Sequence, residues 1–382
     1  MGVEFLMKPR GIINLGNVVL SGVMRRGNTV FDRQVHLEKV MQWLCRAQDS
    51  TPDDGVSEGY HLYHGWLPSY PETTGYIIET FFDYHRLTND DSFKARAKLM
   101  ADWLISTQNL DGSIPDSYFR NKMVFDTGQV IFGLVRTYEE TGFEKYREVA
   151  VLAGEWLVAV QAQNGSWVKH AVNDIPHSYY SRVAWSLLRL HSVTQLQKFL
   201  DAAVRNIEWA IQQQRASGWF DNASFSPDEH STPVTHTIAY TIRGILECGL
   251  YLDEARFVNS ARQAVDGLAA HLPDNGRVAG TYDANWHGDD SYSCLTGDAQ
   301  LAIIMYKLYQ QKRDDRYLTA ANRITEYLKG KHELHSDNPD LHGAIAGSDP
   351  IWGKYIHFCY PNWAAKFFAE SLITADGVTQ PA

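Results

Sequence analysis

The chain has 382 residues, of which 44% are hydrophobic and 21% are charged, a balance typical of a globular protein. Its formal net charge is -10 and its lysines and arginines do not cluster, which argues against nucleic acid or an anionic membrane as a partner. The sequence contains no run of about eighteen apolar residues of the kind that spans a membrane, so we expect a soluble protein.

Residues 1–30 come before the first repeated unit and are expected to form an N-terminal extension. Their apolar run is interrupted by Asn14, Asn17 and Ser21, and no small-residue cleavage site follows it. We therefore expect no signal peptide and a cytoplasmic location. Residues 31–382 are expected to form a single catalytic domain, because one repeat pattern runs through them.

A unit of two helices recurs along the chain, and this repeat decides the predicted fold. The first helix of each unit has an apolar face at helical spacing, and the tryptophans of the first four units, Trp43, Trp103, Trp156 and Trp209, lie 60, 53 and 53 residues apart. A glutamine and then a glycine turn follow these four helices, at Gln48–Gly55, Gln108–Gly112, Gln161–Gly165 and Gln214–Gly218. Glycine after a helix supplies the left-handed conformation that ends it.

The second helix of several units contains a threonine–glycine pair, at Thr74-Gly75, Thr127-Gly128 and Thr296-Gly297. Small residues also stand at the equivalent points of units three and four, Ser181 and Ala239. A small residue there allows neighbouring helices to approach closely at the crowded centre of a closed ring. Six such units predict an all-α fold, an (α/α)6 toroid of six helical hairpins.

In such a toroid the inner helices direct their N-terminal ends, with free N–H groups and partial positive charge, at one mouth of the ring. The residues after the small positions are polar, namely Tyr76, Gln129, Arg182, Tyr240 and Asp298. Because buried polar groups are costly unless they are satisfied, the set favours a functional cavity over a packed axis. The alternative is a register shifted by one residue, with these side chains as surface caps.

Two carboxylates stand beside these residues. Glu72 follows Ser69-Tyr70-Pro71 in a capping-box pattern, and Asp126 with Gln129 fits a helix N-cap. A capping role and a catalytic role can coexist, because a carboxylate at a helix start is held in a defined orientation. We interpret Glu72 and Asp126 as a pair of catalytic carboxylates.

Further candidates are expected at the same mouth. His236, Tyr240 and Arg243 share one helical face, and Tyr179 and Tyr180 precede the inner helix of unit three. The expected catalytic residues are Glu72, Asp126, His236, Tyr179, Tyr180, Tyr240 and Asp298. The expected substrate-binding residues are His64, Trp66, Tyr76, Gln129, Arg182, Arg243, Trp286, His287, Asp289 and Trp363, since aromatic faces can cover sugar rings.

The four cysteines are widely separated and are expected to be reduced thiols. Cys294, His357 and Cys359 precede the inner helices of units five and six, where lanthionine-forming cyclases, which have a related toroid, hold zinc. The spacing here departs from the adjacent Cys-His pair of those enzymes. We therefore expect no metal and no cofactor, and zinc at these three residues remains an open question.

The glutamine and glycine turns resemble the Gln/Trp repeat of terpene cyclases and of several sugar-processing toroids. Residues 69–78, 176–185 and 236–247 resemble helical-toroid proteins encoded with bacterial exopolysaccharide genes, of the polysaccharide-biosynthesis and six-hairpin glycosidase-like type. This resemblance implies an oligo- or polysaccharide substrate. It does not supply a reaction.

Several functions therefore stay open. Glycosidic-bond hydrolysis needs two carboxylates, which Glu72 could supply with Asp126, Asp298 or Asp289. A uronate lyase or C5-epimerase would instead use Tyr, His and Arg side chains such as Tyr179, His236 and Arg182. A non-catalytic sugar-binding or scaffold toroid is a third reading. A terpene-cyclase-like enzyme is a distant fourth, because His287-Gly-Asp289-Asp290 lacks the first aspartate of the DxDD pattern. The oligomeric state is unknown.

Overall fold

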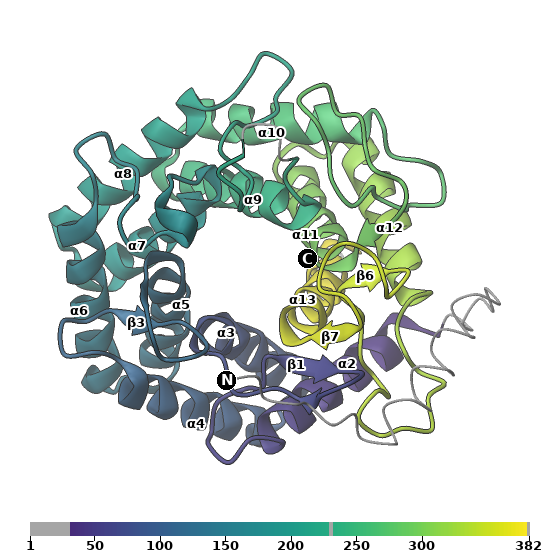
Figure 1. Cartoon of the computed structure of the whole chain (residues 1–382), viewed down its shortest axis with the longest axis horizontal. Helices are drawn as coiled ribbons and strands as arrows, with labels where there is room; N and C mark the ends of the chain where they lie inside the picture. Colours follow the sequence, from purple (N-terminus) through teal and green to yellow (C-terminus); the bar gives the residue numbers. More distant parts are fainter. Residues whose placement is uncertain (1–30, 229–231, 380–382) are drawn as a thin grey trace, which may run out of the picture.

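The computed structural model describes residues 31–228 and 232–379, and within them twelve helices form two concentric rings (Figure 1). The inner ring consists of α3 (Pro71–Thr88), α5 (Val124–Thr141), α7 (Ser181–Thr194), α9 (Thr235–Leu252), α11 (Leu295–Lys312) and α13 (Asn362–Thr379). The outer ring consists of α2 (Arg33–Asp49), α4 (Asp91–Thr107), α6 (Glu144–Val160), α8 (Gln197–Gln212), α10 (Ala255–Ala269) and α12 (Asp315–Lys329).

Each inner helix packs against the next inner helix, and α13 closes the ring against α3. The predicted (α/α)6 toroid is therefore confirmed. One detail differs, because the tightly packed hairpins are an inner helix with the outer helix that follows it, and α2 packs against α13. The predicted N-terminal extension, residues 1–30, lies outside the described residues.

The two ends of the toroid are built differently. At one end, two-residue turns connect five inner helices to the outer helices that follow. The first residue of each turn is left-handed and donates its N–H to the carbonyl four residues earlier, at Asn89, Gly142, Gln195, Asp253 and Arg313. Long loops fill the opposite end, where the inner helices begin, so the loops that can vary in sequence all face one mouth.

These long loops contain only short secondary structure. The 3-10 turns are η1 (Val172–Asp174) and η2 (Ser178–Tyr180), and the strands are β1 (Gly59–His61), β2 (Gly65–Trp66), β3 (Ile114–Pro115), β4 (Lys122–Met123), β5 (Ser293–Cys294), β6 (Ser348–Asp349) and β7 (Cys359–Pro361). The strands β2, β1 and β7 form an antiparallel sheet with Tyr60 opposite Trp66 and Tyr360. The pairs β3–β4 and β5–β6 are also antiparallel.

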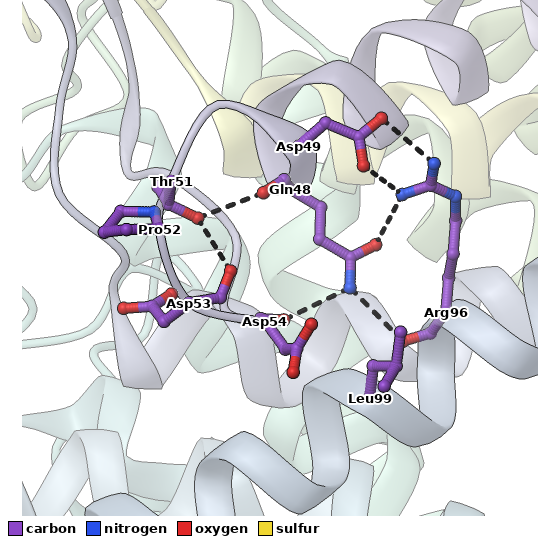
Figure 2. Close-up of a pocket in the computed structure, with 8 residues that line it drawn as sticks. All are labelled: Gln48, Asp49, Thr51, Pro52, Asp53, Asp54, Arg96 and Leu99. Atoms are coloured by element: carbon purple, nitrogen blue, oxygen red, sulfur yellow. Dashed lines mark hydrogen bonds and ion pairs between the residues drawn. The ribbon is translucent and has the colours of Figure 1, made fainter.

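The repeated glutamines connect neighbouring outer helices. The side-chain amide of Gln161 donates to the carbonyl of Gly165 in its own turn, at 3.0 Å, and to the carbonyl of Ala202 in α8, at 2.9 Å. Gln108 and Gln214 make the same two bonds in their own units. Gln48 bonds to the carbonyls of Asp54 and Arg96 (Figure 2). The glutamine repeat is therefore a structural device of the outer ring.

The turn glycines meet the backbone of the next outer helix. Gly112, Gly165 and Gly218 have φ values between +88° and +91°, and Gly276 and Gly343 continue the series in units five and six. A Cβ at Gly165 would lie 2.2 Å from the carbonyl oxygen of Arg205. Glycine is required here both by the backbone conformation and by the close approach.

The small residues of the inner ring have the role that the sequence predicts. A Cβ at Gly75 would lie 2.7 Å from the Cα atom of Val130, and one at Gly297 would lie 2.7 Å from the backbone nitrogen of His236. Inner helices therefore touch backbone to backbone at these points. In the described part of the chain, no helix is long and apolar enough to cross a membrane.

We predict that Gly165→Ala lowers thermal stability more than Gly142→Ala does. Both glycines have positive φ, so each substitution costs about 1 kcal/mol for the left-handed conformation. Only Gly165 also faces a backbone oxygen, whereas nothing lies within 4 Å of a Cβ at Gly142. Melting temperatures of the two variants test this, and equal losses would contradict the close-contact explanation.

Candidate functional site

The two candidate carboxylates lie on neighbouring inner helices at the long-loop end. Pro71 starts α3, and Glu72 follows it in the first turn, where a carboxylate is favoured by the helix dipole. Asp126 lies in the first turn of α5, directly after β4. The hydroxyl of Tyr70 donates a hydrogen bond to Oε2 of Glu72 at 2.6 Å. Sequence reasoning did not select Tyr70 as a site residue.

Burial in protein dominates the electrostatics of this pair. It raises the pKa of Glu72 to about 7, although the Tyr70 hydrogen bond and the charge of Arg182 act in the opposite direction. The pKa of Asp126 is raised well above its usual range by burial and then by the charge of Glu72. The pair thus favours a state in which Asp126 keeps its proton and Glu72 ionises near neutral pH.

Arg182, in the first turn of α7, lies among aromatic rings from the inner helices α3, α5, α9 and α13. Its side chain is fully buried, and Nε donates to Oε1 of Gln129 at 2.6 Å. Its guanidinium carbon lies 5.6 Å from the ring centroid of Tyr76 and 4.9 Å from that of Tyr240. The structure therefore brings together four of the five residues that the repeat register predicts, namely Tyr76, Gln129, Arg182 and Tyr240.

His236 belongs to the same cluster. Its ring centroid lies 4.2 Å from that of Tyr240, and Nδ1 lies 2.6 Å from the side-chain amide nitrogen of Gln300. Burial and then the charge of Arg182 lower the pKa of His236 to about 3, so the imidazole is neutral. Tyr355 also contacts His236, at 5.6 Å between centroids, and its hydroxyl accepts a bond from Nε1 of Trp363.

Tyr179 and Tyr180 are held by the loop that precedes α7. The rings of both pack against Phe125, next to Asp126 in sequence, at 5.4 and 5.6 Å between centroids. His177 fixes this loop, because its two ring nitrogens lie 2.8 Å from the carbonyl oxygen of Val172 and 3.0 Å from that of Ser224. Burial raises the pKa of Tyr179 well above its usual range.

Two buried polar atoms of this cluster, Nη1 of Arg182 and Oε1 of Gln300, form no hydrogen bond within the described residues. Most buried polar groups in proteins are paired, so such atoms need an explanation. Their gathering at one point indicates a site that is completed by a ligand or by water.

Asp298 and Arg243 are placed differently from the expectation. Oδ2 of Asp298 accepts from the Ser293 hydroxyl at 2.7 Å, and the register position on α11 next to His236 is taken by Gln300. Arg243 pairs with Glu370, one turn deeper along the ring. The prediction places Asp298 by its distance from the Thr296-Gly297 pair. Helix α11 begins one residue before that pair, whereas α5 begins three residues before Thr127-Gly128.

The remaining predicted residues lie apart from the cluster, except Trp363. The indole nitrogen of Trp66 donates to Asp340, and that of Trp286 donates to the Ser217 carbonyl at 2.9 Å, with Trp286 only 3% exposed. Both indole nitrogens are therefore used in contacts within the chain, and Trp286 is buried whereas Trp66 is half-buried. His287 and His64 are exposed and Asp289 is half-buried: His287 pairs with Asp283, Asp289 pairs with Lys354, and His64 stacks on His61.

The cysteines do not gather into a metal site in the described part of the chain. Cys294 and Cys359 are buried, His357 is exposed, and no group of three His, Cys, Asp or Glu side chains there could hold a metal ion. Burial raises the pKa of the Cys294 thiol, which therefore stays protonated.

A surface groove of about 320 Å³ lies on the outer ring, between the end of α2 and α4 (Figure 2). Its side chains are engaged with one another, since Arg96 bonds to both Asp49 and Gln48. These are the contacts of the repeated glutamine turn, so the groove is a feature of the outer ring, separate from the carboxylate cluster.

Comparison with known proteins supports the fold. A family model described as the ulvan lyase N-terminal domain matches residues 121–280, which is less than half of the chain. No curated protein is significantly similar to this chain.

Solved structures resemble it over nearly its whole length. An unsaturated glucuronyl hydrolase specific for heparin has 16% identity and a TM-score of 0.73, covering 91% of this chain and 97% of that chain. Cellobiose 2-epimerase from Bacillus thermoamylovorans has 12% identity and a TM-score of 0.70, covering 89% and 97%. A polysaccharide lyase has 12% identity and a TM-score of 0.66, covering 92% and 99%. At such low identity these likenesses show a shared fold, the six-hairpin toroid that the sequence predicts.

We predict that Glu72→Gln stabilises the protein at pH 8 but not at pH 4. Because the folded state raises the pKa of Glu72 from 4.5 to about 7, wild-type stability falls as pH rises through this window. Glutamine cannot ionise, so the difference at pH 8 should be on the order of 3 kcal/mol. Denaturant unfolding at both pH values measures it, with the exposed Glu148→Gln as control. A difference that does not change with pH would contradict the assignment.

Proposed function

We propose that this chain is a carbohydrate-active enzyme that hydrolyses a glycosidic bond of an oligo- or polysaccharide. The observation that carries the proposal is the pair of carboxyls formed by the half-buried Glu72 and the buried Asp126, on neighbouring inner helices. Glycosidases use two carboxyl groups, one protonated and one ionised, on either side of the scissile bond. The raised pKa of Asp126 and the pKa of about 7 for Glu72 supply these two states near neutral pH.

In this proposal Asp126 donates its proton to the glycosidic oxygen as the bond to the anomeric carbon breaks. Glu72, ionised, either accepts a proton from the attacking water or attacks the anomeric carbon itself. Tyr70 holds Glu72 through its hydrogen bond, and Arg182 provides positive charge near the pair. Water supplies the atoms added to the two products, so no cofactor is required.

The second candidate is elimination or C5-epimerisation at a uronate, because His236, Tyr240 and Arg182 form one cluster with unpaired polar atoms. The ulvan lyase model also matches the segment that contains these residues. The buried tyrosines are less suited to be bases than carboxylates are, because burial raises the pKa of both Tyr179 and Tyr240. We therefore place hydrolysis first.

We expect Glu72→Gln and Asp126→Asn each to lower turnover by at least about 100-fold while the fold is retained, because each removes a proton-transfer group at nearly constant shape. Tyr179→Phe and Tyr240→Phe should have much smaller effects. Assays of reducing ends on an oligosaccharide panel, with circular dichroism for folding, test this. Full activity in both carboxylate variants would exclude this hydrolytic mechanism, and products that absorb as unsaturated uronates would favour the lyase.

The pH profile gives a separate test. If Glu72 must be ionised, kcat/KM should fall as pH drops below about 7. The Tyr70 hydrogen bond lowers the pKa of Glu72, so Tyr70→Phe should move this acidic limb to higher pH. A limb that stays unchanged in Tyr70→Phe, or moves to lower pH, would contradict the role of Glu72 as the ionised partner.

A further inference from the structure

The loop between β3 and β4, residues 116–121, projects two aromatic side chains into solvent. Tyr118 is 70% exposed and Phe119 is 52% exposed. We call this loop the hairpin tip. Large aromatic side chains gain little stability when they are exposed, so packing does not explain this pair.

The hairpin tip is held in one conformation by Asp116. Its carboxylate accepts hydrogen bonds from the backbone N–H of Tyr118 and Arg120, at 3.1 and 2.9 Å, and from the side chain of Asn121 at 2.7 Å. Phe119 has a φ of 56°, a left-handed conformation that costs a bulky residue about 1 kcal/mol or more. A loop that exposes aromatic rings at the cost of a strained backbone conformation indicates a binding role.

Basic side chains accompany these rings, in a chain whose net charge is -10. The guanidinium of Arg120 lies 5.5 Å from the ring centroid of Tyr118. The charges of Lys169 and Lys122 lower the pKa of His170 and those of Asp174 and Asp111 raise it, so both basic and acidic groups lie near His170. Lys122 pairs with Asp111, whereas Arg120 and Lys169 form no salt bridge within the described residues. The tip therefore combines two exposed aromatic rings with the guanidinium of Arg120.

The hairpin tip stands at the same end of the toroid as the carboxyl pair. Strand β4 leads directly into α5, and Asp126 is the third residue of that helix. Tyr118 and Asp126 are eight residues apart in sequence, so even a fully extended chain would separate them by no more than about 26 Å. A saccharide chain of a few units could reach from one to the other.

We propose that the hairpin tip is a distal subsite for a carboxylate-bearing polysaccharide chain that extends from the carboxyl pair. The flat rings of Tyr118 and Phe119 cover the apolar faces of sugar rings, and Arg120 donates a two-pronged hydrogen bond to a uronate carboxylate. The inference rests on the proposed function, because it places the reacting bond at Glu72 and Asp126. It adds that the enzyme prefers long acidic chains to short ones.

Calorimetric titration with size-graded oligosaccharides of hyaluronan, alginate and polygalacturonate tests the proposal, with cello-oligosaccharides as uncharged chains of matched length. The full chain is used as wild type, as Glu72→Gln to prevent turnover, and with Tyr118→Ala/Phe119→Ala or Arg120→Gln added. Phe143→Ala is the matched control, because Phe143 is also 52% exposed but lies in the two-residue turn between α5 and α6, at the other end of the toroid.

We expect affinity to rise with the length of an acidic chain, and to fall tenfold or more for long chains in Tyr118→Ala/Phe119→Ala, with disaccharides and Phe143→Ala unaffected. Arg120→Gln should reduce the salt dependence of binding. Unchanged length dependence in the tip variants, or equal binding of uncharged chains, would overturn the subsite alone. If binding depends on the hairpin tip but wild type and Glu72→Gln are equally active, only the proposed function is overturned. Failure of every acidic chain to bind would overturn both.

Discussion

The placement of a half-buried Glu72 beside a buried Asp126 on neighbouring inner helices is the constraint on which the rest of the site depends. Two carboxyls that are removed from water cannot both ionise cheaply, so one keeps its proton and the other titrates near neutral pH. The hydrogen bond from the Tyr70 hydroxyl and the positive charge of Arg182 lower the pKa of Glu72 and so favour its ionised form. An acid and a base thus arise from two chemically similar side chains because of where the helices place them.

The toroid supplies this placement through its asymmetry. At one end, two-residue turns with a left-handed first residue fix the hairpins, and glycine contacts such as Gly75 against Val130 bring the inner helices close together. At the other end the connections are long and can carry Tyr70, the Tyr179 loop and the hairpin tip. The glutamine hydrogen bonds, for example those from Gln161 to the carbonyls of Gly165 and Ala202, connect the outer helices and do not involve residues of the site.

The sequence predicts the ring and part of the site, for physical reasons that can be stated. Apolar periodicity and the Thr-Gly pairs report backbone contacts, so they predict the helices and bring Tyr76, Gln129, Arg182 and Tyr240 together. Asp298 bonds to Ser293, and Gln300 is the residue of α11 that contacts His236, a difference that a repeat count does not reveal. Trp66 and Trp286 show that an aromatic residue in a loop can have a packing role. No sequence pattern selects Tyr70, Gln300 or Tyr355, so these residues are not predicted. The sequence does not reveal the left-handed first residues of the two-residue turns, because only one of them, Gly142, is a glycine.

The central claim is that Asp126 holds a proton at a pH where ordinary carboxyl groups are ionised, beside a Glu72 that ionises near pH 7. Infrared difference spectroscopy of the carboxylic C=O stretch, recorded between pH 4 and 9, measures this directly. The account predicts a band that persists above pH 7 in wild type and loses intensity in Asp126→Asn, where Asp298, whose pKa burial also raises, still contributes. If all carboxylic acid bands have disappeared by the time the pH is raised to about 5, as expected for ordinary carboxyl groups, the claim is contradicted.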